Sequence, residues 1–265
     1  MDDPVVDIVV ERTNGVGVVR LNRPDRGNSV TPQVVTELGD AVEGLCQDDQ
    51  VDAVVLTGTG SVFCAGADVQ EMYAVYRADG ADGLMSYLAD VWMPAVQRTV
   101  RRLWSAPKPT VAAFNGAATA GGLDFGLTCD VRIAASTARF AESYVHLGMV
   151  PVAGGAYLLP RLVGPSTATR MLASGRLIGA EEAERIGLVE RVCEPDELVA
   201  ASTALAEELG QGADATFART KQVVRLAATA ELDAALDASL RANIDLIARG
   251  EVRDRMVAVM ERYSA

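Results

Sequence analysis

Short apolar runs typical of buried strands alternate with amphipathic stretches along most of the chain. Two strand-like runs flank Asn14-Gly15, so residues 5–21 predict a β-hairpin. Thr31 and Pro32 predict the start of a helix that runs to about Cys46, with the threonine hydroxyl as N-cap and the proline at the first helical position.

Three further apolar runs are short and rich in β-branched or small residues, as buried strands are. They are residues 53–57, 110–114 and 131–135. A helical pattern follows Asp68, with a break expected at residues 79–83 and a kink or interruption expected at Pro94. Another helix is expected to begin near Gly121.

After Pro195 the strand signals disappear and helical periodicity takes over. The sequence therefore predicts an α/β core formed by residues 1–195. Residues 196–265 are predicted to form a helical C-terminal region.

The composition is that of an ordinary globular protein, with 265 residues of which 49% are hydrophobic and 23% are charged. The net charge of −12 argues against binding to nucleic acid, because phosphate recognition needs a basic surface. No apolar run is long enough to cross a membrane, and Met1–Pro4 lacks the basic flank of a signal peptide. We therefore expect a cytoplasmic protein with no membrane association.

The cysteines and the single histidine narrow the possible chemistry. The four cysteines are widely spaced and form no CxxC, which favours reduced thiols over a disulfide framework or a zinc site. His146 is the only histidine, so a metal site built from several histidines is excluded and no metal is expected. A lone histidine is more often structural than catalytic, although histidine is common in acid–base catalysis.

One pattern occurs twice: an apolar strand, a cluster of small residues and then an acid. The first copy runs from Ala53 to Asp68 through Cys64-Ala65-Gly66-Ala67, and the second runs from Thr110 to Asp124 through Ala120-Gly121-Gly122. Small residues let a ligand approach the backbone, and the first N–H groups of a helix have no intrahelical partner. Two such turns facing one point would supply the two donors that stabilise a developing oxyanion.

The same residues have a simpler interpretation, because small side chains also let a helix pack tightly against a strand. The spacing does not show that the two turns converge. If Gly121 is the N-cap, Asp124 occupies the third helical position, where an acid often interacts with the helix start. Capping or positioning is the role expected of Asp68. The sequence contains no GxxxxGK[ST], GxGxxG, GxSxG or HExxH motif.

These turns and the segments around them resemble the crotonase superfamily, also called the enoyl-CoA hydratase/isomerase family. The resemblance extends from Val16 to beyond Asp196. The segments that carry it are Val16–Pro24, Phe63–Asp68, Lys108–Thr110 with Asn115-Gly116, Gly121–Asp130, Leu159–Gly164 and Ala180–Val189.

The resemblance implies a crotonase-type spiral of ββα repeats, with a helical C-terminal region that forms a homotrimer or a hexamer made of two trimers. It implies that the backbone N–H groups of Ala67 and Gly121 form an oxyanion hole, and that Arg23, Ala65 and Asp68 contact or frame CoA. The implied substrate is an acyl-CoA, or a thioester on a carrier protein, with no other cofactor.

Hydratases of this family use two glutamates to handle the proton and the water. Asp124 stands at the first of these positions, Tyr144 stands at the second, and Glu142 lies two residues before Tyr144. A tyrosine, whose ordinary pKa is ~10, can donate a proton but is a poor base at neutral pH. The candidate catalytic residues are therefore Asp124, Tyr144 and Glu142. Val152 replaces a common glycine and is expected to reshape the acyl pocket.

Other large side chains lie where the family builds its acyl pocket, although helix core is their simpler interpretation. They are Tyr73, Tyr76, Met85, Tyr87, Trp92 and Met93. The best-supported function is hydration of an enoyl-CoA or the reverse dehydration, with Asp124 as the acid/base. One carboxylate and a tyrosine fit isomerisation or decarboxylation at least as well, and C–C bond hydrolysis also occurs in the family. A non-catalytic CoA-binding subunit is the alternative of another class.

Overall fold

The computed structural model describes residues 6–211 and 215–228, together with residues 236, 237, 240, 241, 245 and 249. The chain divides into two compact units, Met1–Gly210 and Gln211–Ala265. The first unit contains both sheets and the candidate site. The division at residue 195, which rests on secondary structure in the sequence, stays a prediction.

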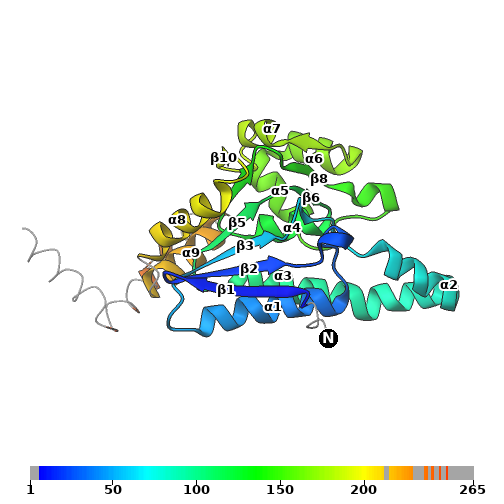
Figure 1. The fold of residues 1–265 in the computed structure, drawn as a ribbon, viewed down its shortest axis with the longest axis horizontal. Coiled ribbons are helices and arrows are strands. Elements are labelled where there is room, and N and C mark those ends of the chain that lie inside the picture. The colour runs from blue at the N-terminus through cyan, green and yellow to red at the C-terminus, as the bar shows by residue number, and fades with distance from the viewer. Residues whose placement is uncertain are drawn as a thin grey trace, which may run out of the picture. The chain divides into compact units, whose positions relative to one another are not determined.

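A six-stranded sheet forms the larger sheet of the first unit (Figure 1), in the order β1-β2-β3-β5-β7-β10. Its strands are β1 (Ile8–Thr13), β2 (Val16–Leu21), β3 (Ala53–Gly58), β5 (Thr110–Phe114), β7 (Val131–Ala135) and β10 (Arg191–Cys193). Only the β1–β2 pair is antiparallel among these described strands. The predicted hairpin is confirmed, with Asn14 and Gly15 at φ 49° and 78° in its two-residue turn. Val5, its predicted first residue, lies outside the described residues.

A second sheet has four short strands in the order β4-β6-β8-β9. They are β4 (Val62–Cys64), β6 (Ala117–Thr119), β8 (Arg139–Ala141) and β9 (Ile178–Gly179). The successive pairs β3–β4, β5–β6 and β7–β8 each place one strand in the larger sheet and the next in the smaller one, and a helical segment follows each pair. This repetition is the predicted spiral of ββα units.

The described helices connect and cover these strands. They are α1 (Pro32–Gln47), α2 (Val69–Ser86), α3 (Met93–Ser105), α4 (Gly121–Thr128), α5 (Gly155–Val163), α6 (Pro165–Ser174), α7 (Ala180–Arg185), α8 (Leu198–Gly210) and α9 (Ala215–Ala227), with the short turns η1 (Pro24–Arg26), η2 (Tyr87–Trp92) and η3 (Ser143–Leu147). Gly80 leaves the helical conformation inside α2, which confirms the predicted break. The π-helical turn η2 lies directly before α3, which carries Pro94 in its first turn.

Alternate side chains along the strands bury both faces of the larger sheet. Val18 and Val55 share one core cluster with Leu198 of α8, whereas Val19 and Leu56 on neighbouring positions belong to a larger core that includes α1 and α3. Three aromatic rings link the two sheets within that larger core. Phe114 of β5 lies 4.6 Å from Phe63 of β4 and 5.0 Å from Phe140 of β8, measured between ring centroids.

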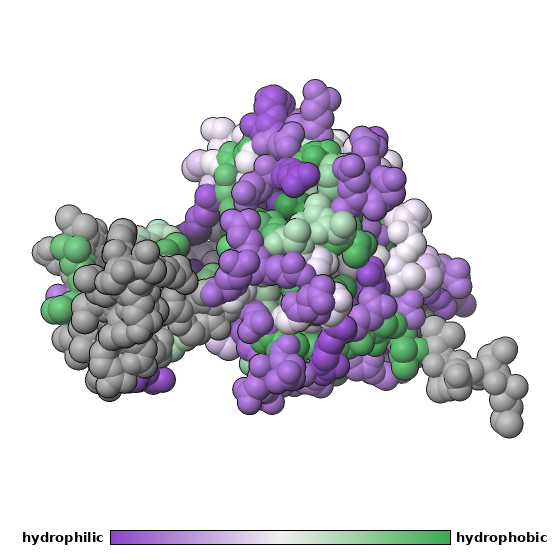
Figure 2. Space-filling view, turned by 60° about the vertical axis from the view of Figure 1, so that its left-hand side comes forward, coloured by the Kyte–Doolittle hydropathy of each residue, from purple (hydrophilic) through white to green (hydrophobic). Residues whose placement is uncertain are grey.

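Hydrophilic side chains cover much of the face shown in Figure 2, and hydrophobic residues appear between them in small groups. No helix in the described part of the chain is long and apolar enough to cross a membrane.

Candidate active site

The two turns rich in small residues meet in space. A Cβ built on Gly66 would lie 3.4 Å from the backbone nitrogen of Gly121 and 3.4 Å from the Cβ of Ala120. A Cβ on Gly122 would lie only 2.1 Å from the carbonyl oxygen of Cys64. The turns therefore converge, and Gly122 is required for their close packing.

Two backbone N–H groups at this junction, those of Ala67 and Gly121, stand apart from the hydrogen bonds that their neighbours make. The Val30 N–H donates to the Gly66 carbonyl at 2.8 Å, and the Asp68 N–H donates to the Val30 carbonyl at 3.0 Å. Because successive peptide groups of an extended segment point in opposite directions, the Ala67 N–H points away from Val30. Gly121 is the first residue of α4, so its N–H has no acceptor within the helix.

The residue before Gly121 has a strained backbone. Ala120 adopts φ 48° and ψ −125°, a conformation that a residue with a Cβ rarely takes, and such strain is concentrated at functional sites. The helix begins at Gly121 as predicted, but its N-cap is Ala120, so the case in which Gly121 is the N-cap does not apply. Asp124 is therefore the fourth helical residue, and its N–H donates to the Ala120 carbonyl at 3.1 Å.

The three candidate catalytic side chains form one buried group. Asp124 and Glu142 are 0% exposed and Tyr144 is 4% exposed. The Tyr144 hydroxyl donates to Asp124 Oδ2 at 2.8 Å. A Cβ on Gly155 would lie 2.3 Å from Asp124 Oδ1 and 2.9 Å from Glu142 Oε1. The two carboxyl groups thus meet beside the first residue of α5, at a point where only glycine fits.

Burial shifts the acidity of all three groups. It raises the pKa of Asp124, although the hydrogen bond from Tyr144 acts in the opposite direction. Burial and then the neighbouring Asp124 charge raise the pKa of Glu142 far above the usual carboxyl range. The same two causes raise the pKa of Tyr144, so its hydroxyl keeps its proton.

A pocket of about 230 Å³ opens beside these groups. Its lining residues are Ala65, Ala67, Val69, Met72, Trp92, Ala120, Ser143, Tyr144, His146, Leu147 and Met149. The predicted site residues Ala65, Ala67 and Tyr144 therefore line one cavity. The Tyr144 hydroxyl lies 3.3 Å from the position of a Cβ on Gly121, which places it next to the second turn.

The structure also sorts the predicted acyl-pocket side chains. Trp92 lines this pocket, whereas Tyr73 and Tyr76 are exposed, at 57% and 47%. Met72 was missed, although it lies one residue from Tyr73 on the same helix. Three other lining residues were also not predicted, and their position just after Tyr144 was the available signal: His146, Leu147 and Met149.

Arg23 and Asp68 lie at the outer side of the first turn. Arg23 Nη2 is 3.4 Å from Asp68 Oδ2, and Arg23 Nε is 3.6 Å from Asp7 Oδ1. Asp68 is the N-cap of α2, with Oδ1 accepting the N–H groups of Gln70 and Glu71 at 3.2 and 3.3 Å. These contacts give both residues structural roles, and their contact with CoA stays a prediction.

Cys64 in the first turn is not arranged as a nucleophile. Its buried thiol donates to the Asn28 carbonyl at 3.1 Å, and burial raises its pKa to about 12. Among the described residues, no group of three or more His, Cys, Asp or Glu side chains is placed to hold a metal ion.

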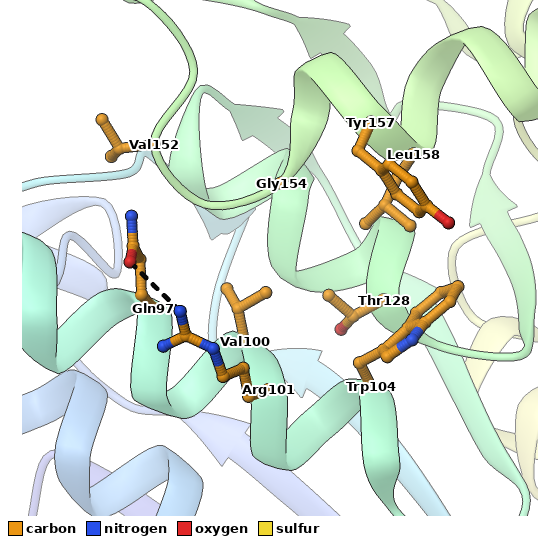
Figure 3. A pocket seen from close by; sticks show the side chains of 9 residues that line it. All are labelled: Gln97, Val100, Arg101, Trp104, Thr128, Val152, Gly154, Tyr157 and Leu158. Atoms are coloured by element: carbon orange, nitrogen blue, oxygen red, sulfur yellow. Dashed lines mark hydrogen bonds between the residues drawn. The ribbon is translucent and has the colours of Figure 1, made fainter.

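A second pocket of about 430 Å³ lies between α3 and the loop that leads into α5 (Figure 3). Its walls include Val152 and Gly154 on the loop side and Trp104 and Tyr157, whose rings meet edge to face at 6.4 Å. Val152 belongs to this pocket and is not among the described residues that line the pocket with Ala67. Its predicted effect on an acyl group is therefore not supported by a position in the pocket beside Ala67.

Comparison with known proteins agrees with the resemblance seen in the sequence. The family described as enoyl-CoA hydratase/isomerase matches residues 11–265. The chain is 33% identical over 258 residues to a short-chain-enoyl-CoA hydratase of Clostridium acetobutylicum, covering 97% of this chain and 95% of that protein. It is 32% identical over 260 residues to a crotonyl-CoA hydratase of Syntrophomonas wolfei, covering 98% and 96%. The crystal structure of an enoyl-CoA hydratase from Bacillus anthracis matches with a TM-score of 0.87 at 28% identity, covering 97% of each chain.

Proposed function

The chain belongs to the enoyl-CoA hydratase/isomerase family, and we propose that it is an acyl-CoA-processing enzyme of the hydratase/dehydratase type. The observation that carries this proposal is the convergence of the turns at Ala67 and Gly121 beside the hydrogen-bonded pair of Tyr144 and Asp124. Two N–H donors next to a proton-transferring group are what enolate chemistry at a thioester requires.

In this proposal the thioester carbonyl oxygen accepts hydrogen bonds from the Ala67 and Gly121 N–H groups. Charge that develops on this oxygen is then stabilised by donors that need no reorganisation. The acyl chain occupies the pocket lined by Met72 and Trp92. Arg23, Ala65 and Asp68 frame the CoA moiety, so CoA is part of the substrate and no other cofactor takes part.

Asp124 is the proposed acid/base, and Tyr144 stands between it and the pocket. In hydration, a water molecule loses a proton to the buried group as its oxygen bonds to the β-carbon, and the α-carbon gains a proton from the same group. Proton uptake and release balance within one turnover, so the buried group begins and ends with the same charge. The raised pKa of Asp124 suits this exchange near neutral pH.

Other reactions of the superfamily are the second candidate. Tyr144 stands where hydratases of the family have a glutamate, and a single carboxylate beside a tyrosine fits double-bond isomerisation or decarboxylation at least as well as hydration. C–C bond hydrolysis is a further reaction of the superfamily. A non-catalytic CoA-binding subunit is the remaining alternative. The buried Asp124–Tyr144 bond argues against it, because a binding subunit has no need to keep a carboxylate out of water.

The test is turnover of crotonyl-CoA, followed by loss of the conjugated thioester absorbance and by product chromatography, beside a panel of branched and longer enoyl-CoA thioesters. We expect hydration of at least one member. Double-bond migration or loss of CO₂ without hydration would select the second candidate. Binding of CoA thioesters by calorimetry without any turnover would identify a binding subunit. Matched pantetheine and carrier-protein thioesters separate a CoA substrate from a carrier-bound one.

We further propose that the protein is cytoplasmic, acts in fatty acid metabolism and assembles as a homotrimer or as a hexamer of two trimers. The support for assembly is the family resemblance together with the helical pattern of the sequence after Pro195.

A further inference from the structure

Glu142 is a fully buried acid with an unusual environment. Its side chain is 0% exposed, and neither carboxyl oxygen accepts a hydrogen bond from any N–H or O–H of the described residues. No ion pair among the described residues includes Glu142 or Asp124. An ionised carboxylate in such a place would be strongly destabilised, because nothing in the protein replaces its lost hydration.

The nearest polar partner of Glu142 is the other carboxyl group. Glu142 Oε1 and Asp124 Oδ1 lie 2.9 and 2.3 Å from the same point, the position of a Cβ on Gly155, and the two side chains are within hydrogen-bonding reach. Asp124 Oδ1 also accepts no hydrogen bond from another of the described residues. Two carboxyl groups this close cannot both be ionised, so one of them carries a proton.

The surroundings decide which group carries it. Asp124 accepts the Tyr144 hydroxyl at 2.8 Å, and the nearby N–H groups of Ala153 and Gly155 also favour its charged form. Glu142 has no such donor, and its pKa is raised by burial and by the neighbouring Asp124. The negative charge therefore rests on Asp124 and the proton on Glu142.

We propose that Glu142 is a neutral carboxylic acid whose O–H donates to Asp124 Oδ1, so that Glu142 positions Asp124 as the single carboxylate of the site. Asp124 then receives one donor on each oxygen: Tyr144 on Oδ2 and Glu142 on Oδ1. The group of three carries one negative charge and two dissociable protons. Glu142 is a positioning residue, and Gly155 is the position that lets the two carboxyl groups meet.

The catalytic part of this inference rests on the proposed function. Asp124 alone can accept a proton from the substrate or from water, because a second ionisation would place two carboxylates side by side in a dry site. The enzyme therefore works with one base, and a proton taken up by Asp124 must leave before another is accepted. This sets it apart from members of the family that have glutamates at the two usual positions.

Infrared spectroscopy of the ligand-free protein tests the charge state without any turnover. At neutral pH the wild type should show the C=O band of a buried neutral carboxylic acid, and Glu142→Gln should lack it. Glu208→Gln, which changes an exposed glutamate of α8, should keep the band. A wild-type spectrum without the band would overturn the proposal.

Kinetics test the positioning role. Glu142→Gln keeps an N–H that can donate to Asp124, so kcat should stay within about tenfold of wild type, whereas Glu142→Leu should lose about tenfold to a hundredfold in kcat with little change in KM. Gly155→Ala should resemble Glu142→Leu, because its methyl group occupies the space between the carboxyl groups. If Glu142→Gln loses as much activity as Asp124→Asn, Glu142 is an ionised catalytic base and the proposal is wrong. A protein with the infrared band but no acyl-CoA turnover would instead refute only the proposed function.

Discussion

At the scale of single residues, Tyr144 is in direct contact with the pocket and Asp124 is not, which the sequence alone does not indicate. It lines the pocket and donates to Asp124, whereas Asp124 itself has no exposed surface. We expect Asp124→Asn to lower kcat by about a hundredfold or more, because the amide cannot exchange the proton. Tyr144→Phe should lower kcat by about tenfold to a hundredfold, since it removes a hydrogen bond to a charged group.

Steady-state hydration rates of the two variants and wild type, with circular dichroism as the folding control, check this prediction. Near-normal kcat in Asp124→Asn together with a large loss in Tyr144→Phe would reverse the two roles and make the tyrosine the working acid.

The pKa of Glu142 also predicts how stability depends on pH. Its pKa is raised in the folded protein by burial and by Asp124, so the folded state holds a proton that the unfolded chain releases above pH ~4. The free energy of unfolding contributed by this group therefore falls as pH rises from about 4 through neutral pH, with a slope approaching about 1.4 kcal/mol per pH unit. Glu142→Gln removes that dependence.

Urea unfolding of wild type and Glu142→Gln from acid to mildly alkaline pH measures the difference. We expect the variant to gain stability relative to wild type as pH rises. Parallel curves for the two proteins would mean that Glu142 titrates normally.

The sequence indicated the three residues of the site on different grounds, and it did not indicate how they pair. Asp124 and Tyr144 were found because the resemblance places them at the two catalytic positions, and Glu142 was found through its distance of two residues from Tyr144. The pairing of Glu142 with Asp124 could not be predicted, because it depends on Gly155 of a different helix. Whether a buried carboxyl group is paired is a property of tertiary packing, which local patterns do not contain.

At the scale of elements, the two neighbouring glycines of the second turn have different roles. Gly122 must lack a side chain because the Cys64 carbonyl lies against it, whereas a Cβ on Gly121 would meet the end of the Tyr144 side chain in a tight contact of 3.3 Å. The packing and the functional interpretations of the small residues thus apply to neighbouring positions of one turn. The strain at Ala120 fixes the direction of the peptide group that carries the Gly121 N–H.

This division predicts the effect of changes at Gly121. Gly121→Pro removes the N–H at the first position of α4, where proline is tolerated, and should lower kcat by about a hundredfold to a thousandfold through loss of one oxyanion donor. Gly121→Ala keeps the N–H, and its Cβ requires only a small shift of the Tyr144 hydroxyl from 3.3 Å, so it is the matched control and should lose much less.

Both variants are compared by crotonyl-CoA turnover after circular dichroism and thermal melting show that they fold. A folded Gly121→Pro protein with nearly wild-type activity would exclude this N–H from catalysis. If the proline variant unfolds, Ala67→Pro tests the other donor of the pair.

Long elements were predictable and short ones were not. The hairpin, α1 and the strands β3, β5 and β7 follow from runs of apolar residues long enough to show a period. The strands β4, β6 and β8 have three residues each, which is too short for a pattern, and they exist because parallel pairing within the second sheet holds them. The turns that carry the site lie at the ends of β4 and β6, so their convergence depended on elements that the sequence did not predict.

At the scale of the whole molecule, the described part of the second unit exposes several large apolar side chains. Val224 is 63% exposed and Leu226 is 43% exposed on α9, and Leu236 and Leu240 are 57% and 60% exposed. Large apolar side chains exposed to water are stabilised when another protein chain covers them. With the family resemblance, this exposure supports assembly through the C-terminal region.

We therefore expect the protein to sediment as a trimer or hexamer, with three or six times the chain mass of 27.9 kDa. Closed assemblies of identical chains bury the same apolar patch in every copy, so one change weakens every interface at once. Val224→Asp should shift the distribution toward smaller species at micromolar concentration, because it places a charge in a desolvated contact. Gln222→Glu, an exposed polar neighbour on α9, adds negative charge without removing apolar surface and should leave the assembly intact. A wild-type protein that stays monomeric across micromolar concentrations would contradict the prediction, and equal dissociation of the two variants would assign the effect to charge repulsion instead of apolar contact.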